Sequence, residues 1–197
     1  MSKQGQRIGE IMSYLRTFLP WIVFAVAPSG DWQWAALAAL VIAVAVIAQQ
    51  VRSGVGLDAL IIEAGSAVFF AVLAAIAFTH HDSDVHTYSA ALSAGTLAVI
   101  AGVSLAIGRP FTLGIAKQTT PREMWGLKAF IRVNVVITAV WTAAFVLTAV
   151  VLAVLEHGGH AHSTAATLVQ IAGFVVPMLF TVRYVAHVQA KPAAQTI

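Results

Sequence analysis

Cysteine is absent from this 197-residue sequence, and charged residues are scarce, at 10% of the chain. Without cysteine the chain can form no disulfide, no thiolate metal site, no cysteine-linked haem and no cysteine nucleophile. A soluble globular domain usually carries about 25% charged residues. With 59% hydrophobic residues and a mean hydropathy of +0.86, this chain has too few polar groups to cover a water-facing surface. Lipid must therefore be its solvent.

Sequence motifs that carry catalysis are also missing. There is no G-x-S-x-G, P-loop, H-E-x-x-H or Rossmann fingerprint, so we expect neither an enzyme nor a bound cofactor. The net charge of +3 is not accompanied by aromatic residues interleaved with the basic ones, which argues against a nucleic-acid partner. The basic excess fits retention of Lys and Arg at the cytoplasmic face of a lipid bilayer.

The sequence does contain a series of six apolar stretches. They predict an all-α fold, a polytopic transmembrane helical bundle in one integral membrane domain, residues 1–197. The stretches cover residues 14–27, 34–51, 59–78, 88–107, 133–155 and 164–182. The last four approach or exceed the length of about 20 residues that a membrane-crossing helix needs. The first two are shorter, so they form either two thin spans or a hairpin that dips part-way into the bilayer.

The basic residues are confined to certain connections between the stretches. All eleven Lys and Arg residues lie at the two termini and in the connections between stretches 2 and 3 and stretches 4 and 5. The other three connections carry no Lys or Arg but contain Asp31, Asp82, Asp84 and Glu156. The positive-inside rule then places the basic side, with both termini, in the cytoplasm, and the chain is expected to be a multi-pass membrane protein.

The first stretch has a second interpretation. A basic start, a short apolar run and Ala25-Val26-Ala27 are typical of a signal peptide with a small-residue cleavage site. Pro28 would follow the cut directly, and its fixed φ and missing N–H fit an extended protease substrate badly. The remaining stretches keep the same orientation under either interpretation.

The connection between stretches 4 and 5 contains two helix-boundary signals. Gly108-Arg109-Pro110 is predicted to end the fourth span. Thr120-Pro121-Arg122-Glu123 is a capping box with proline at the first helical position. We expect a helix that begins at Pro121, lies along the cytoplasmic membrane surface before span 5 and holds Trp125 at the level of the lipid headgroups.

Small residues recur at four-residue spacing in three of the stretches, as in membrane helices that pack closely. They predict a tight unit of spans 2, 3 and 4. The stripes are Ala35, Ala39 and Ala43; Ala67, Ala71 and Ala75; and Ala94, Ala98, Gly102 and Ala106.

A few polar side chains fall inside or beside the spans. Glu63 lies within the third span, where a carboxylate is costly unless it is paired or functional. It is interpreted as the partner of Arg109, Arg132 or Arg183, as a side chain that reaches the interface, or as a proton or cation site on a transport path. Asn134 in the fifth span is expected to form interhelical hydrogen bonds. Glu63, Arg109, Arg132 and Asn134 are thus the polar pathway candidates.

Histidine is concentrated on the opposite side. Six of the seven histidines lie in the two extracytoplasmic connections after spans 3 and 5, beside acidic residues. Imidazole and carboxylate groups are ligands for zinc, nickel and copper. The metal-ligand candidates are His80, His81, His157, His160 and His162. A pH-responsive role and an accident of composition are the alternatives.

Three short motifs resemble those of a known family. They are Phe18 to Phe24; Arg109-Pro110-Phe111; and Pro121 to Trp125 followed by Asn134, Trp141 and Phe145. In these the chain resembles the intracellular septation protein A (YciB-like) family of bacterial inner-membrane proteins, with a similar order of spans over about three-quarters of its length. The resemblance implies a location in the bacterial inner (plasma) membrane and a role in the envelope or in division, and it supplies no catalytic residues.

Two functions are weighed. The first is a non-enzymatic inner-membrane protein that supports cell-envelope synthesis or division through contacts with membrane-protein partners. The alternative is a small transporter or channel for protons, metal ions or a small solute, acting as a homo-oligomer. The resemblance and the absence of catalytic motifs favour the first. The second is favoured by Glu63, the short first hairpin, the histidines and Pro177 in the last span.

Overall fold

The structure is a computed structural model that describes residues 3–27, 31–56, 60–80, 83–161 and 163–190, with the backbone alone for residues 3–11. These residues form helices and connections without a β-strand, which confirms the all-α fold. The helices are α1 (Lys3–Val26), α2 (Trp32–Arg52), α3 (Ile61–Thr79), η3 (Asp84–His86), α4 (Ser89–Ala106), α5 (Phe111–Lys117), η4 (Arg122–Met124), α6 (Lys128–His157) and α7 (Thr164–Ala190). The predicted Asp82, His81 and His162 lie outside the described residues.

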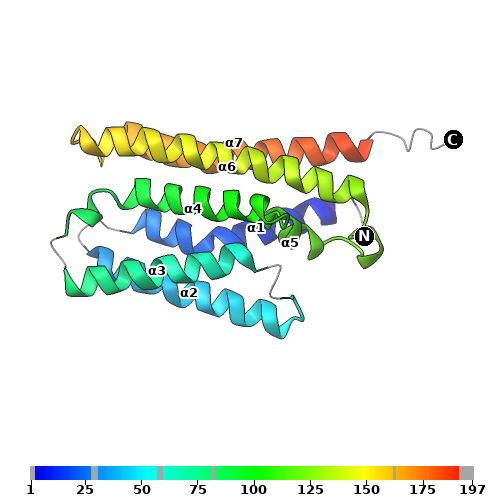
Figure 1. Ribbon diagram of the computed structural model, residues 1–197, viewed down its shortest axis with the longest axis horizontal. Helices are drawn as coiled ribbons and strands as arrows, with labels where there is room; N and C mark the ends of the chain where they lie inside the picture. The colour runs from blue at the N-terminus through cyan, green and yellow to red at the C-terminus, as the bar shows by residue number, and fades with distance from the viewer. Residues whose placement is uncertain (1–2, 28–30, 57–59, 81–82, 162, 191–197) are drawn as a thin grey trace.

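Six long helices run alternately in opposite directions, so that α1 begins at the end of the bundle where α7 finishes (Figure 1). We call this the basic end, because it carries the exposed side chains of Arg52, Arg109, Arg122, Arg132 and Arg183. We call the opposite end the acidic end; it carries Asp31, Asp84 and Glu156. The alternation explains how residues scattered along the chain reach one end.

Within the described part of the chain, five helices are long and apolar enough to cross a membrane: α2, α3, α4, α6 and α7. This is compatible with a multi-pass membrane protein. The expectation of a short second span is wrong, since α2 has 21 residues. It begins at Trp32, two residues before the predicted stretch, and ends at Arg52, one residue after it. In α1, the apolar part is limited to Met12–Val26, so the first stretch is short as expected.

The connection between α4 and α6 begins as predicted. Gly108 follows the end of α4 with φ +71°, a left-handed conformation that glycine adopts without steric cost. The helix α5 then starts directly after Pro110 and turns into the bundle, where Phe111, Thr112 and Ile115 are buried. Ser104 secures this turn, because its hydroxyl accepts a hydrogen bond from the Phe111 N–H (3.1 Å). The sequence had not indicated that this segment is a buried element.

The prediction of an interfacial helix that begins at Pro121 is wrong about the length of that helix. Only the 3₁₀ turn η4 follows Pro121, and no side-chain cap forms there. Gly126 and the extended Leu127 (ψ 127°) separate this turn from α6, which begins at Lys128. Glycine is a poor helix former, so the capping-box signal starts one turn that cannot continue.

Helix packing differs in part from the predicted unit of spans 2, 3 and 4. The most extensive contact joins α4 with α6, and the next joins α2 with α3, whereas α3 and α4 touch less. The α2 stripe at Ala35, Ala39 and Ala43 is buried as expected. In α3, however, Ala71 and Ala75 are exposed. Larger residues of α3, including Phe70 and Leu73, fill the interior instead, so small size alone did not identify the packed face.

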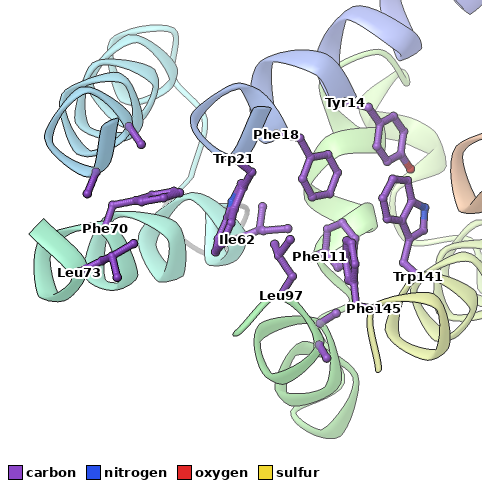
Figure 2. Close-up of a cluster of buried hydrophobic side chains, with 14 of the residues drawn as sticks. Tyr14, Phe18, Trp21, Ile62, Phe70, Leu73, Leu97, Phe111, Trp141 and Phe145 are labelled. Atoms are coloured by element: carbon purple, nitrogen blue, oxygen red, sulfur yellow. The ribbon is translucent and has the colours of Figure 1, made fainter. Parts of the chain in front are cut away.

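An aromatic cluster forms the centre of the bundle (Figure 2). Trp141 of α6 stacks on two residues of α1, with ring centroids 4.9 Å from Phe18 and 5.8 Å from Tyr14. Phe111 and Phe145 contact the same indole ring from α5 and α6. These contacts fasten α1 to the second half of the chain, although its most extensive contacts are with α2.

Close packing also joins α6 to α7 near a proline. Gly173 of α7 lies against Thr148 of α6 so tightly that an added Cβ would overlap the threonine side chain. Pro177 lies one turn further along α7 and lacks the N–H that would bond to the Gly173 carbonyl. The Thr181 hydroxyl donates to the Pro177 carbonyl (2.8 Å) and accepts from the Trp141 indole N–H (3.0 Å). The proline region is thereby tied to the aromatic cluster.

Candidate functional site

The Glu63 carboxylate lies near the start of α3, at the basic end of the bundle, and is only 2% exposed. Its Oε1 accepts hydrogen bonds from the Thr17 hydroxyl of α1 and from the Gln50 side-chain N–H of α2, each at 2.9 Å. Three helices therefore meet at this one oxygen. These hydrogen bonds offset part of the cost of burying the carboxylate, whose Oε2 has no hydrogen-bond partner among the described residues.

The hydrogen bonds continue from Gln50 to the surface of the bundle. The Gln50 side-chain oxygen accepts from the Gln118 amide (2.7 Å), and the Gln118 oxygen accepts from the Arg16 guanidinium. We call this set the Glu63 chain; its members are Arg16, Thr17, Gln50, Glu63 and Gln118. It connects α1, α2, α3 and the end of α5, and its cation lies at one end with its carboxylate at the other.

The expected ion pair of Glu63 with Arg109, Arg132 or Arg183 is not formed. All three arginine side chains are exposed, and among the described residues none of them contacts the Glu63 carboxylate. Arg16 of α1 is linked to the carboxylate instead, through the side-chain amides of Gln118 and Gln50. The reason is geometric, because the burial of α5 brings Gln118 between α1 and α2.

Asn134, the other predicted polar candidate in a span, is buried in α6 apart from the Glu63 chain. Its side-chain amide donates to the Phe130 carbonyl of its own helix (2.9 Å). Its backbone carbonyl accepts from the Thr112 hydroxyl of α5 (3.0 Å), and Thr112 also bonds to Thr138 (2.8 Å). The interhelical hydrogen bond at this position thus uses the Asn134 backbone and anchors α5.

Trp125 lies at the basic end as part of a small exposed motif. Its indole N–H donates to the Thr120 carbonyl (2.9 Å). Its ring has the Lys117 ammonium 5.2 Å and the Arg122 guanidinium 5.7 Å from its centroid. Cations at this distance from an aromatic face are attracted by its electrons. Pro121 precedes the turn that carries these residues. The result is an ordered basic surface around Trp125.

The histidines at the acidic end do not gather within the described part of the chain. No group of three or more potential metal ligands is found there. The His80 ring lies 2.9 Å from the Thr79 hydroxyl, and the His157 ring lies 3.4 Å from the Tyr88 hydroxyl. His160 is exposed, and His81 and His162 lie outside the described residues. Metal binding by this set stays a prediction.

An apolar cavity of about 580 Å³ occupies the half of the bundle toward the acidic end. It is bordered by α1, α4, α6 and α7 and by the start of α2, and it extends from Glu156 to Trp141 and Tyr14 at mid-bundle. Its volume lies within the range of about 300–1,000 Å³ typical of small-molecule sites. Glu63 borders neither this cavity nor the smaller groove lined by Met12, Ser13, Leu15, Arg16 and Leu19.

Glu156 is buried at the acidic end of this cavity, with 3% exposure. Its Oε1 accepts from the Ala91 backbone N–H in the first turn of α4 (3.1 Å). The first N–H groups of a helix have no partner within that helix, so a carboxylate there is stabilised. In the sequence Glu156 was an acid of a connection, and its burial against a helix start was not foreseen.

Sequence reasoning found Glu63 but missed most of its partners. Arg16 and Thr17 interrupt the first apolar stretch, and Gln50 interrupts the end of the second. Polar residues at such positions are a signal for interhelical hydrogen bonds. No sequence signal could have identified Gln118, whose role depends on the unexpected burial of α5.

The chain matches no family model, and neither a curated protein nor a solved structure is detectably similar to it. The likeness to the septation-protein family therefore rests on the three short motifs alone.

Proposed function

We propose that the chain is a non-catalytic, multi-pass protein of the bacterial plasma membrane that supports envelope synthesis or division through contacts with other membrane proteins. The observation that carries this proposal is the Glu63 chain. A carboxylate that serves transport needs an aqueous route to it. Glu63 instead has its Oε1 hydrogen-bonded by Thr17 and Gln50, and it borders neither of the two cavities described above. Its arrangement supports a role in fixing helix positions.

The contact surface in this proposal is the basic end around Trp125. This surface combines an ordered aromatic ring with exposed cations on the segment between α4 and α6. Aromatic and arginine side chains contribute strongly to protein interfaces. The same residues also suit the anionic headgroups of a cytoplasmic leaflet, to which each cation near the surface adds about 1 kcal/mol of attraction.

A bacterial strain that lacks the protein is expected to show a weakened envelope, measured as increased entry of a dye that intact cells exclude. A variant with Trp125→Ala and Arg109→Ala should reproduce most of this defect, while Trp34→Ala, which changes an exposed tryptophan of α2, should not. Both variants must reach the membrane in wild-type amounts. A strain without the protein that has a normal envelope would contradict the proposal.

Transport is the second candidate, and the apolar cavity favours it because it reaches mid-bundle from the acidic end. Purified protein in liposomes loaded with a pH-sensitive or metal-sensitive dye separates the two functions. We expect wild-type protein, Glu63→Gln and empty liposomes to give equal proton and metal fluxes. A flux that wild-type protein supports and Glu63→Gln abolishes would establish the transport function instead.

The orientation in this proposal puts the basic end in the cytoplasm, with six crossing helices and both termini inside. Because the sequence has no cysteine, single cysteines can be introduced without a background. A membrane-impermeant maleimide should label His160→Cys in intact cells and Glu123→Cys only after the membrane is opened. Both positions are exposed, so a reversed labelling pattern would invert the topology.

A further inference from the structure

The apolar cavity opens between two helices. The exposed apolar side chains on its border belong to α1 and α7 and are Leu15, Ile22, Val26, Ile171, Val175 and Leu179. Such a rim suits hydrocarbon, so a ligand that enters from the bilayer between α1 and α7 need not pass through water. Along α6 the cavity extends from Glu156 to Trp141, about 22 Å at 1.5 Å per residue.

The inner wall of the cavity is aromatic. Its buried members Phe18, Trp21, Trp141 and Phe145 come from α1 and α6. This wall can bury a hydrocarbon chain, and the faces of its rings also attract cations. The aromatic wall therefore suits the hydrocarbon chain of an amphiphile.

Two polar atoms on the border of the cavity are left without partners. The Oε2 atom of Glu156 and the Oγ atom of Ser93 are buried and form no hydrogen bond within the described residues. The other carboxylate oxygen of Glu156 is held by the Ala91 N–H, which fixes the group in place. An unpaired carboxylate oxygen in apolar surroundings is costly. Both atoms would be satisfied by a ligand that donates hydrogen bonds.

The charges on the border of the cavity indicate which kind of hydrogen-bond donor the ligand carries. Among the residues that the structure describes, no Lys or Arg borders the cavity, so a phosphate or carboxylate headgroup would meet Glu156 without the countercharge of either. An ammonium group would supply both the charge and the hydrogen bonds. We propose that this cavity binds an amphiphilic amine, whose ammonium group pairs with Glu156 and Ser93 and whose hydrocarbon chain lies along the aromatic wall toward Trp141. The inference goes beyond the envelope role and does not depend on it.

The binding test uses the full chain in phosphatidylcholine nanodiscs and dodecylamine that carries bromine at the far end of its chain. Bromine quenches tryptophan fluorescence on contact. Replacing Trp34 and Trp125 with phenylalanine leaves Trp21, Trp32 and Trp141, which all border the cavity. We expect the quenching to reach a plateau as the amine concentration rises, as binding to a site does. Brominated dodecanol has the same chain without the charge, and its quenching should rise without a plateau because it only partitions into the lipid.

Glu156→Gln should weaken amine binding by about ten-fold or more, and Ser93→Ala by a smaller factor. Glu123→Gln removes an exposed carboxylate at the basic end and should leave binding unchanged. If Glu156→Gln does not fold, the comparison of amine with alcohol on the unchanged cavity still decides the question. Equal saturation by the alcohol, no saturation by the amine, or wild-type affinity in folded Glu156→Gln would each overturn the proposal.

Discussion

Replacing Glu63 with alanine is expected to cause a marked loss of stability. The substitution leaves the Thr17 hydroxyl and the Gln50 amide without their buried acceptor. A buried donor without a partner costs about 1–3 kcal/mol, and here two donors lose the same partner. The Gln50–Gln118 bond would also lose its anchor. We expect a clearly lower melting temperature in detergent, monitored by the loss of helical circular dichroism.

Glu63→Gln is the informative companion to this variant. Its amide oxygen can accept the same two hydrogen bonds, so its loss of stability should be clearly smaller than that of alanine. Glu123→Ala is the matched control, because this carboxylate lies at the same end of the bundle but is exposed. If Glu63→Ala had the same melting temperature as the wild-type protein, the Glu63 chain would have no structural role, and the argument against transport would fail.

The sequence predicts those parts of the fold that depend only on whether a short segment is stable inside a lipid bilayer. Apolar length and the absence of charge identified the four later spans, and the structure has α3, α4, α6 and α7 at those places. The Lys and Arg residues were assigned to the correct end because the connections at the other end contain none. These features depend on short stretches of sequence, and no knowledge of the packing partner is needed.

The unpredicted part depends on which segments meet. The segment 111–117 is far too short for a span and lies between two spans, yet its burial positions Phe111 against Trp141 and Gln118 beside Arg16. The expected partners of Glu63 were arginines, because charge was the visible feature of the sequence. The uncharged side chains of Thr17 and Gln50 took their place. Glu156 shows the same limit, since its role depends on the start of α4, 65 residues earlier.

Replacing Trp141 with alanine is expected to destabilise the bundle most. The indole is fully buried and contacts aromatic residues of α1, α5 and α7, including Phe18, Phe111 and Phe174. Truncating a buried tryptophan to alanine costs about 3–5 kcal/mol, through lost contacts and the cavity that remains. The Thr181 hydroxyl beside Pro177 would also lose its donor. Thermal unfolding in detergent measures the loss, and α1 should become accessible to protease before the other helices.

Two comparisons separate the causes of this loss. Trp141→Phe keeps an aromatic ring for Tyr14 and Phe18, removes the indole N–H and leaves a smaller cavity than alanine does, so its loss of stability should be clearly smaller than that of alanine. Trp34→Ala removes an indole that is 58% exposed on α2, and changes at exposed sites usually stay within about 0.5 kcal/mol. If Trp141→Ala behaved like Trp34→Ala, the aromatic cluster would not hold α1 on the bundle. The wall of the proposed amine site would then have no fixed shape, because Phe18 and Trp21 reach it from α1.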